Sequence, residues 1–220
     1  MLVKICGIKD IENALVAVEN GADALGFVFA PSSRQLTPEK AKKIMDTIPA
    51  DVLRVGVFVD APISLVKEIA EYCALTILQL HGNESVDYCR QFKKPVIKAI
   101  RVGEKGEKGN YYPAPELYKG TVKAFLADTY QPHKSGGTGL SFPWREVDNI
   151  RKYGPVILAG GLNLYNVYQA LDITRPDGVD VSSGVETNGH KDDKKIKWFI
   201  KEVRRWENEK DITRSKRIFC

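Results

Sequence analysis

The chain has 220 residues, of which 43% are hydrophobic and 28% charged, with a formal net charge of +5. These values are ordinary for a globular chain with one large core, and the absence of a Pro/Ser/Gly-rich linker predicts one domain. No apolar run is long enough for a secretory signal or a bilayer span, which argues against the secreted and membrane classes and predicts a cytoplasmic protein.

The positive charge and the cysteines point to no special class of protein. Much of the excess charge lies near the end, in RRWENEKDITRSKR (204–217), and no nucleic-acid-binding motif accompanies it. We therefore expect no nucleic-acid partner and no membrane partner. The four cysteines, Cys6, Cys73, Cys89 and Cys220, have neither metal-ligand spacing nor a disulfide pattern, so we expect reduced thiols and no metal site.

Eight short apolar, β-branched segments alternate with segments of helical periodicity along the whole chain. In order they are LVKIC, DALGFVF, VLRVGVFVD, LTILQLH, PVIKAIR, VKAFLAD, PVILAGG and DGVDVSS. This alternation is typical of βα units around a parallel sheet, and eight units predict a closed (β/α)8 TIM barrel of the α/β class. We expect the barrel domain to span 1–204, followed by a flexible basic extension over 205–220.

An open, doubly wound sheet is the competing fold. Its dinucleotide-binding form needs GxGxxG after the first strand, whereas the corresponding turn here is CGIKD, with one glycine. Helix starts are expected at Thr37–Lys40, where a capping hydroxyl precedes a proline, and also at Asn83 and Asn163. The stretch 102–112, VGEKGEKGNYY, is rich in Gly, Lys and Glu and is expected to be a mobile loop.

Strand periodicity predicts which side chains face the barrel interior. Successive side chains on a strand point to opposite faces, so polar residues of one parity should point inward. The inward pairs are Lys4 and Cys6, Gln79 and His81, and Asp180 and Ser182. Barrels of this kind build active sites at the C-terminal ends of their strands. We therefore expect a cluster there formed by Cys6, His81, Asp128 and Asp180, although each alone could be a core or capping residue.

Glycines and small hydroxyls follow the last two predicted strands, in AGGLN (159–163) and DVSSGVE (180–186). Exposed backbone N–H groups in such loops bind phosphate, and barrels often place a phosphate site there. The expected phosphate-binding residues are Gly160, Gly161, Ser182, Ser183 and Gly184. A third glycine-rich stretch after the sixth strand predicts a flap over the mouth, with Gly136, Gly137 and Gly139.

Motifs across nearly the whole chain resemble one enzyme family. They are KICGI, GADALGFVF, the Ser-Arg before TPE, VGVFV, LQLHG, FLADT, GGTG, AGGLN and DVSSGVE. Together they resemble phosphoribosylanthranilate isomerase, an aldose–ketose isomerase of tryptophan biosynthesis. The resemblance implies an Amadori rearrangement of a small phosphosugar, N-(5-phosphoribosyl)anthranilate, to 1-(2-carboxyphenylamino)-1-deoxyribulose 5-phosphate, with no cofactor and no metal.

The resemblance also implies roles for individual residues. The cysteine of KICG, Cys6, would be the general base, and Asp128 would be the general acid. Arg34 would bind the anthranilate carboxylate, for which a planar fork of donors is suited. His81 and Asp180 would line the pocket, with Asp180 beside a sugar hydroxyl. The oligomeric state is open between monomer and homodimer.

Three other functions stay open at this point. Indole-glycerol-phosphate synthase and the histidine-pathway phosphoribosyl isomerase are similar phosphate-binding barrels. However, the synthase family depends on lysine and glutamate, and the histidine-pathway family has an aspartate at the first strand end, where this chain has Cys6. A non-catalytic phosphosugar-binding barrel is the alternative from another class, since a fold does not by itself imply an activity.

Overall fold

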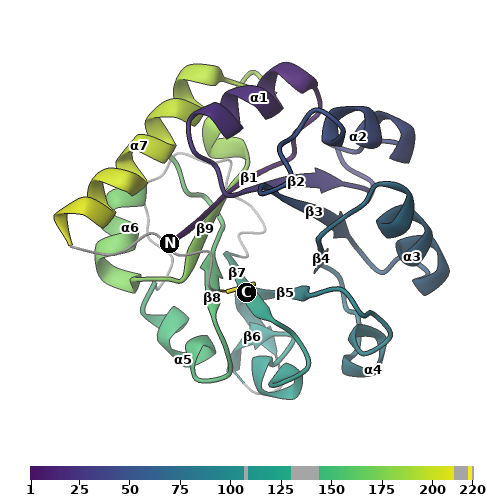
Figure 1. Ribbon diagram of the computed structural model, residues 1–220. Helices are drawn as coiled ribbons and strands as arrows, with labels where there is room; N and C mark the ends of the chain where they lie inside the picture. The colour runs from purple at the N-terminus through teal and green to yellow at the C-terminus, as the bar shows by residue number, and fades with distance from the viewer. Residues whose placement is uncertain (107–108, 130–143, 211–217, 220) are drawn as a thin grey trace.

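The computed structural model describes residues 1–106, 109–129, 144–210 and 218–219. Within these residues, eight parallel strands surround a common axis and helices cover their outer side (Figure 1), which confirms the predicted TIM barrel. The strands pair in the order β4-β3-β2-β1-β9-β8-β7-β5, and a further pairing of β4 with β5 closes the ring.

The eight predicted apolar segments all form barrel strands. These are β1 (Leu2–Cys6), β2 (Ala24–Val28), β3 (Leu53–Phe58), β4 (Ile77–Leu80), β5 (Val96–Gly106), β7 (Ala124–Thr129), β8 (Val156–Leu158) and β9 (Gly178–Val181). Within the described residues, three further short strands lie outside the ring, namely β6 (Gly109–Tyr112), β10 (Glu186–Thr187) and β11 (His190–Lys191).

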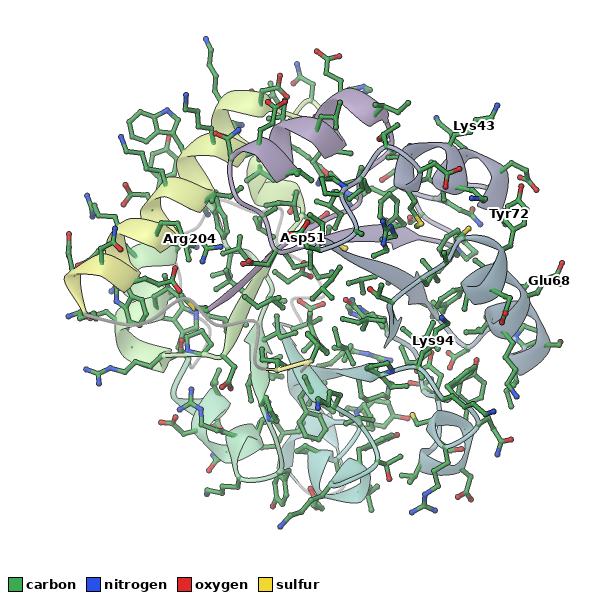
Figure 2. All side chains as sticks on the ribbon, in the orientation of Figure 1. Lys43, Asp51, Glu68, Tyr72, Lys94 and Arg204 are labelled. Carbon is green, nitrogen blue, oxygen red and sulfur yellow. The ribbon has the colours of Figure 1, made fainter. Side chains whose placement is uncertain are left out.

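The α-helices are α1 (Ile11–Glu19), α2 (Pro38–Met45), α3 (Ile63–Tyr72), α4 (Val86–Cys89), α5 (Val147–Arg151), α6 (Val167–Thr174) and α7 (Asp193–Glu209). Short 3₁₀ helices are η1 (Pro115–Tyr118), η2 (Trp144–Glu146) and η3 (Ser183–Val185). Charged side chains such as Lys43 and Glu68 point outward from the helices (Figure 2). No helix in the described part of the chain is both long and apolar enough to cross a membrane.

Apolar side chains form two cores, one on each face of the barrel wall. The inner core contains Leu2, Ala24, Val55 and Ile77, whereas neighbours of opposite parity such as Ile5 pack outward against the helices. This agrees with the two-residue period of a strand and confirms the predicted parity. The inner core fills the lumen, so the polar groups that share this face lie in a largely apolar interior.

One predicted helix start is confirmed and two are displaced. Thr37 caps α2, its hydroxyl oxygen accepting a hydrogen bond from the Lys40 amide, and Pro38 occupies the first turn. The helices expected at Asn83 and Asn163 begin instead at Val86 and Val167, because the asparagines belong to loops that carry their own hydrogen bonds.

The expected mobile loop at 102–112 is wrong as a description of this stretch. Strand β5 continues to Gly106 and pairs antiparallel with β6, with Val102 opposite Tyr111 and Gly106 opposite Gly109. Val102 is buried and Tyr111 packs against the outer core. Two apolar anchors at the base of the hairpin therefore outweigh the Gly- and Lys-rich composition of the stretch.

The boundary expected at residue 204 falls inside a helix. Helix α7 runs to Glu209, and Trp206 is buried against the outer core. Most of the remaining extension lies outside the described residues, but Ile218 is only 7% exposed and belongs to the inner core, with Phe219 packed against that core. The chain end accordingly lies near the barrel axis in Figure 1.

Candidate active site

Cys6 and Asp128 lie on the inner face at the same end of the barrel. Cys6 is the last residue of β1, and Asp128 is the penultimate residue of β7. Both have the parity of the lumen residues, and the C-terminal ends of parallel strands form one mouth. The predicted clustering of these two side chains at one mouth is therefore compatible with the fold.

The Cys6 thiol lies above a buried ion pair. Lys4, two residues earlier on β1, is fully buried, and its Nζ donates to Asp180 Oδ1 at 2.9 Å. Burial raises the pKa of the Cys6 thiol, while the positive charge of Lys4 opposes that rise. Asp180, which is expected to line the pocket, is thus paired with the buried ammonium of Lys4.

A chain of side-chain contacts joins β4 to Asp128. Gln79 Nε2 lies 3.1 Å from His81 Nδ1, and His81 Nε2 lies 3.1 Å from Asp128 Oδ2. The direction of each of these two hydrogen bonds is set by which ring nitrogen of His81 carries the proton. His81 and Asp128, predicted separately from two strand ends, are thus brought into contact.

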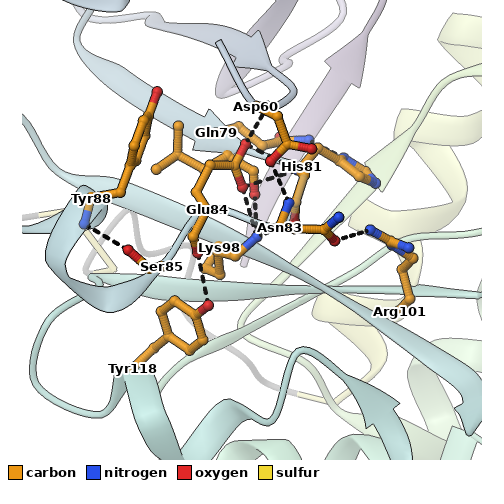
Figure 3. A network of polar contacts seen from close by, with 12 residues as sticks. Asp60, Gln79, His81, Asn83, Glu84, Ser85, Tyr88, Lys98, Arg101 and Tyr118 are labelled. Carbon is orange, nitrogen blue, oxygen red and sulfur yellow. Dashed lines mark hydrogen bonds and ion pairs between the residues drawn. The ribbon is translucent and has the colours of Figure 1, made fainter. Parts of the chain in front are cut away.

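The loop after β4, which carries His81, is organised around a buried ion pair on the outer face of the wall (Figure 3). Lys98 Nζ donates to Glu84 Oε2 at 2.9 Å and to the Gly82 carbonyl at 2.7 Å. Glu84 in turn accepts from the Gly82 and Asp60 backbone amides. These contacts fix the loop directly after His81.

Arg101 is a cation at the mouth that the sequence analysis did not identify. It ends the inward-facing row of β5, opposite Asp128 in the strand register, and donates to Asn83 Oδ1 at 2.8 Å (Figure 3). Its guanidinium also lies 5.3 Å from the centre of the Tyr112 ring. The strand parity that selected Cys6 and His81 could have identified it.

Arg34 is held at the mouth by an acidic partner. Its Nε and Nη2 both donate to the Glu186 carboxylate at 2.7 Å, and Lys191 Nζ donates to the same carboxylate at 2.8 Å. Burial alone would raise the pKa of Glu186, but the hydrogen bonds from these two cations outweigh it and hold the pKa at about 2. Glu186 lies in the quoted motif DVSSGVE, yet its pairing with a residue 152 positions away has no local sequence signal.

Gly7 allows the Arg34 side chain to cross the first strand end. Its φ is +78°, and a Cβ built there would lie 2.5 Å from Arg34 Cδ. A side chain at this position would be strained by the backbone angle and would collide with the arginine. The glycine of KICGI thus has a steric role beside the proposed base.

The two loops predicted to bind phosphate lie backbone against backbone. A Cβ at Gly184 would lie 1.8 Å from the Leu162 carbonyl oxygen, and Gly160 and Gly161 have φ values of +77° and +69°. In the described part of the chain, no backbone carbonyl accepts from the N–H of Gly161, Ser183 or Gly184. The predicted set, which also includes Ser182 with its hydroxyl bonded to the Cys6 carbonyl, is therefore gathered at one rim.

The remaining predictions concern the flap, the metal site and the other cysteines. The predicted flap residues Gly136, Gly137 and Gly139 lie outside the described residues. Among the described residues, no group of three or more His, Cys, Asp or Glu side chains is arranged to hold a metal ion. Cys73 and Cys89 are free thiols buried in the outer core.

Comparison with known proteins gives one consistent family. The model of the N-(5'phosphoribosyl)anthranilate (PRA) isomerase family matches residues 3–202. A protein of Desulforudis audaxviator (strain MP104C) named N-(5'-phosphoribosyl)anthranilate isomerase is 50% identical over 207 residues, covering 92% of this chain and 98% of that protein.

Solved structures agree with this family. Phosphoribosyl anthranilate isomerase from Thermotoga maritima is 42% identical with a TM-score of 0.83, covering 93% of this chain and 99% of that one. A second structure, of phosphoribosyl anthranilate isomerase in complex with reduced 1-(o-carboxyphenylamino)-1-deoxyribulose 5-phosphate, is 40% identical with a TM-score of 0.80, covering 93% and 98%. The family match over most of the chain and the shared barrel lead to one conclusion: this chain belongs to the N-(5'-phosphoribosyl)anthranilate isomerase family.

Proposed function

We propose that the protein catalyses the Amadori rearrangement of N-(5'-phosphoribosyl)anthranilate to 1-(2-carboxyphenylamino)-1-deoxyribulose 5-phosphate in tryptophan biosynthesis. The observation that carries the proposal is a thiol, Cys6, and a carboxyl, Asp128, on the inner face at one mouth of a barrel of this family. Both groups can exchange protons, as an aldose–ketose isomerisation requires.

The reaction needs two proton transfers, at two atoms that are both bonded to C1' of the sugar. Asp128 donates a proton to the ring oxygen as the C1'–O4' bond breaks, which leaves an iminium between C1' and the anthranilate nitrogen. The Cys6 thiolate then removes the proton from C2', and the resulting enolamine tautomerises to the ketone. The contact between His81 and Asp128 Oδ2 leaves Oδ1 as the atom that would carry the transferred proton.

The substrate carries a phosphate at one end and a carboxylate at the other. The mouth of the barrel offers one amide-rich region and one arginine that could bind them. We assign the phosphate to the amides around Gly160, Gly161, Ser182, Ser183 and Gly184. We assign the anthranilate carboxylate to Arg34. Glu186 accepts from Nε and Nη2 of that guanidinium and so fixes its plane, which supports the assignment of a planar carboxylate to the remaining donor, Nη1.

The wider setting follows from the same proposal. The substrate is a small molecule that supplies its own reacting groups, so the reaction as written uses no cofactor and no metal. We expect the enzyme to act in the cytoplasm, as a monomer or homodimer, without nucleic-acid or membrane partners. Asp180 is expected to reach a sugar hydroxyl from its position beside Lys4.

The test follows the fluorescence of freshly generated phosphoribosylanthranilate after addition of purified protein, with no metal or nucleotide present. Wild-type protein should abolish the fluorescence by turnover. Cys6→Ala and Asp128→Asn should each lower kcat by about 10²–10⁴, the usual contribution of a general acid or base. Cys73→Ala, which removes a thiol from the outer core, should keep the wild-type rate. Wild-type turnover by Cys6→Ala would show that the base is another group.

A further inference from the structure

Lys4 is a charged residue in the apolar interior of the barrel. It is 0% exposed on β1 and shares the inner face with Leu2 and other residues of the inner core. Removing an ammonium from water is costly unless it is paired and hydrogen-bonded. Asp180 supplies one partner at 2.9 Å from β9, but a single carboxylate oxygen accounts for only one of the three donors of Lys4.

The Cys6 sulfur lies beside the same ammonium, in a space left by a glycine. Gly26 on β2 has the inward parity, and a Cβ built there would lie 2.7 Å from Cys6 Sγ and 3.0 Å from Lys4 Nζ. The two atoms therefore share the volume that a β2 side chain would otherwise fill. A thiolate at this position would face a cation across a water-poor interior, where electrostatic attraction is strong.

We propose that Lys4 is a positioning residue for the proposed base: held by Asp180, its ammonium stabilises the thiolate form of Cys6. This inference rests on the proposed function, in which Cys6 removes the proton from C2'. A buried ion pair contributes little net stability to a fold, so stability alone does not explain why a lysine is buried at position 4. Control of the Cys6 thiolate gives this lysine a function.

The charges around Cys6 show how this control would operate. Burial raises the pKa of the thiol, Lys4 on β1 and Lys191 on β11 lower it, and Asp180 on β9 raises it; Arg34, after β2, is a further cation near the sulfur. The pKa of Lys4 is itself raised, because Asp180 and Cys6 outweigh the effect of burial, so the residue stays cationic. Without Lys4, burial and Asp180 would act on the thiol in the same direction.

The test measures the thiolate directly. Wild type, Lys4→Met and Asp180→Asn are alkylated with iodoacetamide at a fixed pH near 8, and the rate at each cysteine is read by mass spectrometry of its peptide. Because only the thiolate reacts, the rate at Cys6 reports its thiolate fraction. We expect Lys4→Met to slow this rate by about 10-fold or more, in line with the effect of an opposite charge at close range. We expect Asp180→Asn to speed it severalfold.

Two controls separate electrostatics from damage to the fold. Cys73 and Cys89 are buried outside the lumen, so their alkylation in any variant would reveal unfolding. Lys98→Met removes an equally buried lysine from the outer face of the wall and should leave the Cys6 rate within about twofold of wild type. If Lys4→Met does not fold, Lys4→Gln, which removes the same charge but keeps a polar side chain, takes its place, and the same slowing at Cys6 is expected.

The outcomes distinguish this inference from the proposed function. A Cys6 alkylation rate in Lys4→Met equal to wild type, or lowered equally by Lys98→Met, would overturn the role of Lys4 while leaving Cys6 as the base. If Lys4→Met slows alkylation but Cys6→Ala retains turnover, the coupling stands and the proposed base is wrong. Support for both requires slower alkylation and a basic shift of the pH profile of kcat in Lys4→Met.

Discussion

At the scale of single residues, a missing side chain shapes the site. The geometry around Gly26 leaves no room for even one methyl group between β2 and the sulfur of Cys6. Because Gly26 has an ordinary backbone conformation, alanine would introduce no φ strain there, and its effect would come from the displaced neighbours. A one-carbon change can therefore test the placement of the thiol.

We expect Gly26→Ala to lower kcat by at least 10-fold, while the cost of overpacking is about 1–3 kcal/mol in the free energy of unfolding. Steady-state kinetics and urea denaturation measure the two effects. Gly154→Ala is the matched control, since a Cβ there meets only the Phe125 ring, at 3.2 Å, away from the mouth. Full activity in Gly26→Ala would show that Cys6 can shift without loss, against the tight placement described.

A second prediction at this scale concerns Glu186 and the pH dependence of the free energy of unfolding. Its folded pKa of about 2 lies below the ordinary value of 4.5. A depressed carboxyl pKa stabilises the fold above the unfolded-state pKa, and this stabilisation is lost as the pH falls through the folded-state pKa. The advantage of wild type over Glu186→Gln in the free energy of unfolding should thus be constant above pH 5 and shrink between pH 4.5 and about 2.

Urea unfolding at a series of pH values measures this advantage. Glu68→Gln, on the exposed face of α3, is the control and should show no such dependence (Figure 2). An advantage that grew on acidification would contradict the pairing of Glu186 with Arg34 and Lys191.

At the scale of elements, the loop between β4 and α4 is held by charges rather than by apolar packing. Lys98→Met would leave the Glu84 carboxylate buried without its cation, which typically costs about 3–5 kcal/mol. The double variant Lys98→Met/Glu84→Gln removes both charges and should recover part of that loss. Urea denaturation of the two variants and wild type measures this. Equal stability of the single and double variants would mean that the unpaired carboxylate is not the source of the loss.

The elements also show what local sequence pattern can and cannot predict. All eight strands were predicted from apolar runs, and the inward parity of Lys4, Cys6 and His81 followed from the two-residue period. The β5–β6 hairpin is not predicted, because the Gly-, Lys- and Glu-rich composition of 102–112 hides its two apolar paired residues, Val102 and Tyr111.

Partners far apart in the chain were missed for a different reason. Parity placed Lys4 and Asp180 on the inner face, but their contact joins residues 176 positions apart and depends on barrel closure. The same holds for Arg34 and Glu186, and for His81 and Asp128, 47 positions apart. Residue types and spacing indicated the candidate site, whereas its charge pairs required the assembled barrel.

At the scale of the whole molecule, a residue near the chain end contributes to the inner core of the barrel. Ile218 is buried in the same cluster as Leu2 and Ala24. Ile218→Ala should lower the free energy of unfolding by about 2 kcal/mol, within the range for a buried isoleucine, and lower Tm by several degrees. Calorimetry measures the change. Ile173→Ala, at an exposed isoleucine of α6, should shift Tm by much less, and equal shifts would argue against the buried position.

The seam between β1 and β9 joins the first and last units of the barrel. A nascent chain released at its midpoint would carry the proposed base, Cys6, and its neighbour Lys4, but it would lack Asp180, the carboxylate that pairs with Lys4. Catalytic competence would consequently arrive late in synthesis, when the ring shuts, so that the onset of turnover would time the completion of the fold.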